Sequence, residues 1–260
     1  PEQRETEIKN ISSVYKTLAD EILPQLRRAR LTANYDVIGR SDEEINEAFD
    51  TDAKVLSANE LLYAATLTND KARQEAIYKK TTELYPNDFR AYNNLGMMAY
   101  ANGDFTTAEN YFKQAASKDA NAPEVNTNLG YIELVKGNVA NAETYLSKST
   151  GANTANEALG NLYIKQGQYD RAVQAFGDTK TNSAALAQIL AKDYNKAKNT
   201  LNAVKNPDAY TDYLMAIVGA RTNNADLVKT SMAKVAQKDA TLAAKAQIDR
   251  EFAKYANEIK

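Results

Sequence analysis

Residues 94–112 read NLGMMAYANGDFTTAENYF, and this stretch decides the fold because the chain repeats its pattern. The pattern returns 34 residues later, where residues 128–146 read NLGYIELVKGNVANAETYL. A third copy follows after 30 more residues, where residues 158–176 read ALGNLYIKQGQYDRAVQAF. Leu-Gly, a second Gly, an Ala and a bulky apolar residue keep their relative places in all three copies. Such shared spacing indicates a protein built from helical repeats.

The repeated residues have distinct physical roles in a pair of antiparallel helices. The mid-helix glycines are Gly96, Gly130 and Gly160, the alanines Ala108, Ala142 and Ala172, the bulky residues Phe112, Leu146 and Phe176, and the turn glycines Gly103, Gly137 and Gly167. A mid-helix Gly costs about 1 kcal/mol relative to Ala, so we expect it to permit close approach of the alanine-bearing second helix. We expect the bulky residues to fill the space between successive repeats. The turn glycines supply a left-handed conformation where the first helix ends.

The pattern extends in weaker form on both sides of these copies. Leu61, Tyr78 and Pro86 precede the first copy at the same period, and Ala197 and Leu201 imitate the second helix of a later copy that lacks Leu-Gly. In the last copy, which opens at Pro207-Asp208, core places are expected for Met215, Val228 and Met232. We place the repeats at 55–88, 89–122, 123–152, 153–181, 182–206 and 207–242.

Helical segments are expected to flank the repeats at both ends. The apolar residues from Ile8 to Ala29 follow a helical rhythm, with a kink or break at Pro24, so residues 1–54 form an N-terminal helical segment with a linker at 32–40. Residues 243–260 are expected to form one capping helix, whose apolar face carries Ala246, Ile248, Phe252 and Tyr255. Because the chain begins at Pro1 without an initiator Met, we expect a mature product or a piece of a longer protein.

A period of 34 with Leu-Gly, a small residue, an aromatic residue and Pro resembles the tetratricopeptide repeat family over residues 55–176. This resemblance implies an all-α fold, a right-handed superhelix (α-solenoid) of helix pairs, with a leading helical segment and a C-terminal capping helix. It also implies that the first helices of the pairs line a concave groove.

Composition excludes several chemistries before any motif is considered. The 260 residues include no Cys, His or Trp, which excludes histidine acid-base catalysis, thiol nucleophiles and Cys/His zinc sites. Phosphate-binding and nucleophile-elbow motifs are missing, so we expect no cofactor, no metal and no enzymatic activity. A net charge of −2 without a basic concentration argues against nucleic acid. The longest apolar runs are too short for a membrane span.

Candidate binding residues follow from the spacing of side chains on the first helices. Residues two before and two after each buried Leu, and one turn further, should face the groove. This gives Asn59, Tyr63, Thr66, Asn93, Met97, Tyr100, Thr127, Tyr131, Leu134, Glu157, Asn161 and Ile164. Tyr, Met and Asn together can bury apolar groups and hydrogen-bond a backbone. Arg90 is the lone basic candidate, so a clamp for a C-terminal carboxylate is not supported. Another part of the chain filling the groove is the alternative.

A second resemblance covers nearly all of the chain. The phrases NELLYAATLTND (59–70), AALAQ (184–188), GARTNN (219–224) and EFAKY (251–255) resemble the C-terminal repeat region of OmpA-family outer-membrane lipoproteins from Bacteroidales. This resemblance implies a location in the bacterial cell envelope, in the periplasm or associated with the outer membrane. It also implies that an OmpA-like domain would lie upstream of Pro1.

We therefore expect a non-enzymatic scaffold of the bacterial envelope that binds a peptide or protein segment in its concave groove. The alternative is a structural or self-assembling module that supports an upstream OmpA-like domain. A carboxylate-based hydrolase is disfavoured, because no two acidic groups fall at a separation that would bring them into one pocket.

Overall fold

The structure is a computed structural model that describes residues 2–9, 16–17, 20–21, 39–257 and 259. It divides into two units, residues 1–41 and residues 42–260. In the first unit, helix α1 spans Glu2–Lys9. Most of the predicted helix from Ile8 to Ala29 and most of the predicted linker at 32–40 lie outside the described residues.

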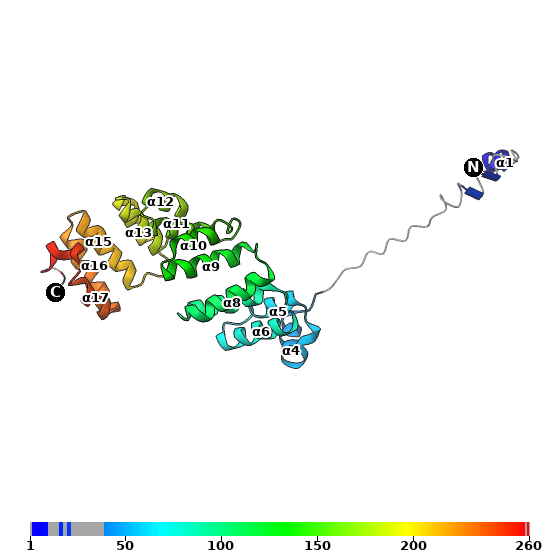
Figure 1. Ribbon diagram of the computed structural model, residues 1–260, viewed down its shortest axis with the longest axis horizontal. Coiled ribbons are helices and arrows are strands. Elements are labelled where there is room, and N and C mark those ends of the chain that lie inside the picture. The colour runs from blue at the N-terminus through cyan, green and yellow to red at the C-terminus, as the bar shows by residue number, and fades with distance from the viewer. Residues whose placement is uncertain (1, 10–15, 18–19, 22–38, 258, 260) are drawn as a thin grey trace. The chain divides into compact units, whose positions relative to one another are not determined.

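The second unit contains a succession of short helices and turns. Its helices are α4 (Asp42–Asp52), η2 (Ala53–Val55), α5 (Ala58–Ala64), α6 (Lys71–Leu84), α7 (Phe89–Ala101), α8 (Phe105–Lys118), α9 (Pro123–Lys136), α10 (Val139–Leu146), α11 (Ala155–Lys165), α12 (Tyr169–Phe176), α13 (Asn182–Leu190), α14 (Tyr194–Asn202), α15 (Ala209–Arg221), α16 (Ala225–Lys238), α17 (Ala240–Ala246) and η3 (Arg250–Tyr255). From α5 to α16 they form pairs, each packed within itself and against the next pair in chain order (Figure 1). Each predicted repeat segment holds one pair, although the last, 207–242, also contains the start of α17. The predicted all-α stack of helix pairs is confirmed.

Short polar signals define where many of these helices begin. Ser57 opens α5 with a complete capping box, in which its hydroxyl accepts from the Glu60 N–H and its own N–H donates to the Glu60 carboxylate. Aspartates cap α6, α7 and α8 by accepting backbone N–H groups that the helices leave unpaired. Pro123 starts α9, where its missing N–H costs nothing.

One turn geometry joins the two helices in five consecutive pairs. One or two residues beyond the end of the first helix, a residue has a positive φ in each pair: 78° at Gly103, 81° at Gly137, 73° at Gly167, 65° at Lys192 and 54° at Asn223. The next residue donates its N–H to the carbonyl five residues earlier, as Asp104 does to Ala99 and Asp193 does to Gln188. This is the Schellman arrangement that satisfies the last carbonyls of a helix. Counting from this left-handed residue, which we call the turn residue, therefore aligns all five pairs.

The mid-helix glycines lie directly under large side chains of their own pair. A Cβ built on Gly96 would lie 2.5 Å from Phe112 Cε1, one on Gly130 2.5 Å from Leu146 Cδ2, and one on Gly160 2.6 Å from Phe176 Cε2. Each bulky residue also belongs to a buried cluster that reaches the following pair, so the predicted packing between repeats is confirmed. The glycines are therefore required by contact, because no side chain fits between the two helices there.

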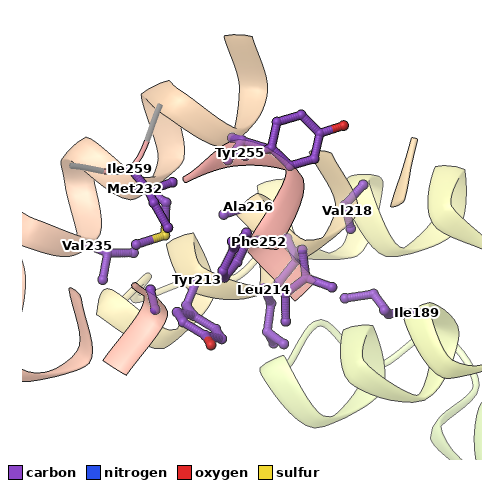
Figure 2. Packing of buried hydrophobic residues seen from close by; sticks show 14 of the residues in the cluster. Ile189, Tyr213, Leu214, Ala216, Val218, Met232, Val235, Phe252, Tyr255 and Ile259 are labelled. Atoms are coloured by element: carbon purple, nitrogen blue, oxygen red, sulfur yellow. The ribbon is translucent and has the colours of Figure 1, made fainter. Parts of the chain in front are cut away.

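The last buried cluster closes the C-terminal end, and Figure 2 shows Phe252 and Tyr255 within it. Val228 and Met232 are buried and Met215 is partly buried against this cluster. The prediction of one capping helix over 243–260 is wrong: α17 ends at Ala246 and a separate 3₁₀ helix begins at Arg250. Asp249 interrupts the helix by capping η3 through the Glu251 N–H. As a result Ile248, expected on the buried face, is 85% exposed.

Within the described residues, no helix combines the length and the hydrophobicity needed to cross a membrane.

Candidate functional site

Two adjoining hollows lie across the first helices of four consecutive pairs, α7, α9, α11 and α13. The first, about 270 Å³, is lined by Met97, Tyr100, Phe112, Asn128, Tyr131, Thr154, Glu157 and Asn161. The second, about 450 Å³, is lined by Tyr100, Tyr131, Leu134, Val135, Asn161, Ile164, Lys165 and Leu186. We call them the Glu157 hollow and the Leu134 hollow, and together they are the groove. Because they share two tyrosines and an asparagine, one ligand can contact both.

Helical register brings these side chains to one face. Met97, Tyr131, Asn161 and Leu186 each lie six residues before the turn residue of their pair. Each of them therefore follows directly after the small residue that lets the second helix pack closely. Stacking of the pairs lines up these equivalent positions into a continuous strip. The repeat spacing that places a small residue against the second helix thus also places the next residue of the first helix in the groove.

Aromatic rings form the centre of the groove. The ring centroids of Tyr100 and Tyr131 lie 6.4 Å apart, and the Tyr100 ring meets Phe105 edge-on at 5.2 Å. Met97 is 45% exposed and Val135 48% exposed, so apolar surface is available beside the rings. An exposed strip of aromatic, thioether and aliphatic groups is the type of surface that buries side chains of a partner.

Burial shifts the pKa values of the two tyrosines in the groove. Burial raises the pKa of Tyr131, and the nearby Glu157 carboxylate raises it further, while the Asn161 side chain partly opposes the shift. Burial also raises the pKa of Tyr100. Both phenols therefore remain neutral at physiological pH and can donate or accept hydrogen bonds.

Besides Glu157, six of the predicted binding residues line the groove. They are Met97, Tyr100, Tyr131, Leu134, Asn161 and Ile164. Their place was predictable because helical spacing from the Leu-Gly pairs fixes it. Glu157, also expected to face the groove, lies in the first hollow.

Another prediction is wrong, because Thr127 is fully buried and donates its hydroxyl to the Pro123 carbonyl at 2.8 Å. This hydroxyl is turned back onto its own helix and does not reach the groove.

The remaining predicted residues are bonded to neighbours within the protein. The Arg90 guanidinium donates to Asp88 and, at 2.9 Å, to the Asn59 amide oxygen. The Asn93 amide oxygen accepts from Asn128 at 2.8 Å. These bonds link successive first helices and supply cross-repeat contacts.

On the first pair, Tyr63 and Thr66 are exposed but outside the two hollows. The Tyr63 hydroxyl donates to Asp42 at 3.1 Å, and the Thr66 hydroxyl donates to the Tyr63 carbonyl at 2.7 Å. Their side chains are thus engaged at the N-terminal end of the second unit.

Several residues of the groove were missed from the sequence. Asn128 precedes the Leu-Gly pair of its helix, Thr154 directly precedes α11, and Val135 and Lys165 lie near helix ends, where spacing alone does not indicate a groove-facing side chain. Leu186 occupies the place of Met97 and Tyr131, but its pair lacks the Leu-Gly signal. Alignment on the turn residues would have found it.

A further cavity of about 370 Å³ lies at the turns after α11 and α13, lined by residues 167–171 and 190–192. One of its two cations, Arg171, donates to the Tyr163 hydroxyl at 2.9 Å and stacks 4.1 Å from the Tyr163 ring centroid. This arginine is therefore committed to holding the turn, and the groove remains the better candidate for a binding site.

Comparison with known proteins agrees with the repeat geometry. Three family models described as tetratricopeptide repeat match residues 77–110, 94–157 and 157–180. No match was found among curated protein sequences.

Solved structures show the same fold at low sequence identity. The chain is similar to one in the APC/C hetero-tetramer Cut9–Hcn1, with a TM-score of 0.66, 15% identity, and coverage of 83% of this chain and 44% of that one. It is also similar to a tetratricopeptide repeat protein from Parabacteroides merdae (TM-score 0.56, 12% identity, 84% and 90% covered). Pseudomonas aeruginosa PilF is similar too (TM-score 0.56, 13% identity, 82% and 99% covered). Residues 77–180 therefore carry tetratricopeptide repeats, and the described helix pairs form the superhelical stack of such proteins.

Proposed function

We propose that this chain is a non-enzymatic scaffold that binds a peptide segment of a protein partner in the groove. The observation that carries the proposal is the pair of hollows centred on Tyr100 and Tyr131, where exposed apolar surface surrounds a few polar groups. Tyrosine anchors of this kind dominate many protein interfaces, and asparagine amides can pair with an extended backbone. A tetratricopeptide fold is consistent with this role.

We further propose that the protein works in the bacterial cell envelope, as part of an OmpA-family lipoprotein. This proposal is supported by the sequence phrases at 59–70, 184–188, 219–224 and 251–255. Fractionation of cells of the source organism, probed with an antibody to this chain, tests it. Recovery with outer-membrane or periplasmic material is expected, and recovery with cytosolic markers would contradict it.

Binding in the groove is tested by selecting ligands for the full chain from a random-peptide display library. The selected peptides should lose about 30-fold or more in affinity for Tyr131→Ala and for Tyr100→Ala, the loss typical of an interface anchor. The matched control is Tyr111→Ala, which removes a tyrosine from the second helix α8, outside the groove. Circular dichroism checks that each variant stays helical. Equal affinity of the peptides for all variants would contradict binding in the groove.

Self-assembly, the alternative role, is distinguished by sedimentation equilibrium. A monomer at all concentrations supports partner binding. A concentration-dependent dimer whose formation is lost in Tyr131→Ala would show that the groove binds a second copy of this chain.

A further inference from the structure

An acidic side chain stands in the Glu157 hollow without a counter-ion. Within the part of the chain that the structure describes, no cation pairs with the half-buried Glu157 carboxylate, and this residue is the single charged group that lines the hollow. Two other carboxylates of the same repeats are neutralised: Glu109 pairs with Lys113 at 2.7 Å, and Glu133 pairs with Lys136 at 3.3 Å. The hollow thus presents a negative charge beside low-polarity walls, where its field is weakly screened.

Two side-chain amides of the hollow also offer oxygens that can accept hydrogen bonds. The Asn128 side-chain nitrogen donates to Asn93 at 2.8 Å, and the Asn161 side-chain nitrogen donates to the Glu157 carbonyl at 3.1 Å. Each amide thereby uses an N–H group within the protein and presents its oxygen as a hydrogen-bond acceptor. A ligand group with several N–H donors satisfies these acceptors, whereas a carboxylate would add to the negative charge.

The tyrosine rings favour the same kind of ligand group. Tyr100 and Tyr131 line both hollows, and their ring faces carry partial negative charge that attracts a cation. A guanidinium can stack on such a face while its N–H groups reach a carboxylate. Carboxylate, amide oxygens and aromatic faces together form a site for a basic side chain.

The neighbouring Leu134 hollow indicates a second feature of the ligand, an apolar group. Leu134, Ile164 and Leu186 make its lining largely apolar. Glu157 and Ile164 are seven residues apart on α11, which is about 10 Å along a helix at 1.5 Å per residue. An extended peptide covers that distance in about three residues.

We propose that the groove recognises a peptide in which an Arg or Lys side chain binds beside Glu157 and an apolar side chain, about three residues away, enters the Leu134 hollow. This inference rests on the proposed function and adds the chemistry of the partner. The polarity is opposite to that of a clamp for a C-terminal carboxylate.

The test measures binding of the full chain to fluorescent peptide mixtures capped at both ends. One mixture fixes Arg and, three residues later, Leu, a second has the reverse order, and all other positions are random uncharged residues. Comparison mixtures replace Arg with Gln or Glu, or Leu with Ser. Fluorescence anisotropy should show about tenfold weaker binding when Gln replaces Arg, no binding with Glu, and several-fold weaker binding with Ser.

The Glu157→Gln variant should bind the Arg and Gln mixtures equally, and Glu157→Lys should prefer the Glu mixture. Glu124→Gln, which neutralises an exposed acid on the preceding first helix outside the groove, should keep the preference for Arg. A preference for Arg that survives in Glu157→Gln would overturn the assignment, as would a parent protein that prefers Glu.

Failure of this inference is distinguishable from failure of the proposed function. Peptides that bind without regard to charge, yet still require Tyr131, would overturn the basic-peptide assignment and leave the groove in place. Absence of binding by every mixture, together with display-selected peptides that ignore Tyr131→Ala, would overturn both.

Discussion

The helix pairs over residues 89–181 and those over 182–238 share one turn geometry but use different small residues at their close contacts. Seven residues before the turn residue, the first region has Gly96, Gly130 and Gly160, while the second has Ala185 and Ala216. Nine residues after it, Phe112, Leu146 and Phe176 correspond to Leu201 and Met232. All of these residues are buried.

This difference shows that the contact position needs a small residue: glycine accompanies Phe112, Leu146 and Phe176, whereas alanine suffices beside Leu201 and Met232. A phenylalanine ring cannot move away from a Cβ without displacing its neighbours. Leu201 and Met232 are flexible side chains and share a cluster with the alanines they accompany. The fold is thus specified by complementary volumes, and the glycine signal is one of several solutions.

Among substitutions that test this comparison, Gly130→Leu should destabilise the protein most, because a Cβ alone would already lie 2.5 Å from Leu146. Overpacking of this kind typically destabilises a protein by about 1–3 kcal/mol. Urea unfolding should show a lower midpoint than the parent protein. The control, Ala140→Leu on the exposed face of α10, should be nearly neutral. Equal midpoints for both variants would show that Gly130 is not in a tight contact.

A buried polar position distinguishes the two regions next. Four residues before the turn residue, the buried Glu133 carboxylate accepts from Asn138 and Asn141, whereas the oxygen of buried Gln188 has no hydrogen-bond partner among the described residues. An unsatisfied buried polar group costs about 1–3 kcal/mol, so Gln188→Met should raise the melting temperature. Glu133→Met should lower it, because two amide donors lose their acceptor. A lower melting temperature for Gln188→Met would mean that the amide is satisfied in solution.

The turn residues offer a smaller, reciprocal test. Gly137 has a φ of 81° and open space around its Cβ position, so Gly137→Ala should cost about 1–2 kcal/mol through backbone strain alone. Lys192 has a φ of 65°, and Lys192→Gly should therefore be neutral or stabilise by up to about 1 kcal/mol. Chemical unfolding of both variants checks the opposite signs. A destabilised Lys192→Gly would contradict the shared turn geometry.

The smallest expected effect is a change in how the stability of the protein depends on pH. Burial would raise the pKa of Glu133, but hydrogen bonds from Asn138, Asn141 and Lys136 outweigh it and lower the pKa overall. A lowered pKa stabilises the fold above the unfolded value of about 4.3, and this contribution disappears as the pH falls through the folded value. Glu133→Gln should therefore lose less stability than the parent protein on acidification below about pH 4.3. A steeper loss of stability in the variant than in the parent protein would contradict a lowered pKa of Glu133.

Sequence alone predicted the turns at Gly103, Gly137 and Gly167, because glycine adopts a positive φ without strain. The same turns at Lys192 and Asn223 lack glycine, and lysine adopts a positive φ only rarely, whereas asparagine adopts it more readily but is a weaker signal than glycine. The six-pair organisation could be placed because the weaker repeats keep their spacing of small and bulky residues.

The candidate site was predictable where helix geometry alone decides the direction of a side chain, as for Met97 and Tyr131. It was not predictable where packing between repeats decides. Burial of Thr127 and the presence of Leu186 in the groove both depend on how neighbouring pairs stack. The break before Arg250 likewise depends on one aspartate cap that competes with the helix.

The measurement that tests the central claim most directly is a double-mutant cycle of Gly96→Ala and Phe112→Leu, which converts a regular contact into the form found at Ala185 and Leu201. Each single change should destabilise the protein in urea unfolding, the first by a clash and the second by a cavity. The double variant should be more stable than the two losses added together, by about 1 kcal/mol or more. Strictly additive losses would contradict the claim that complementary volumes within each helix pair specify this fold.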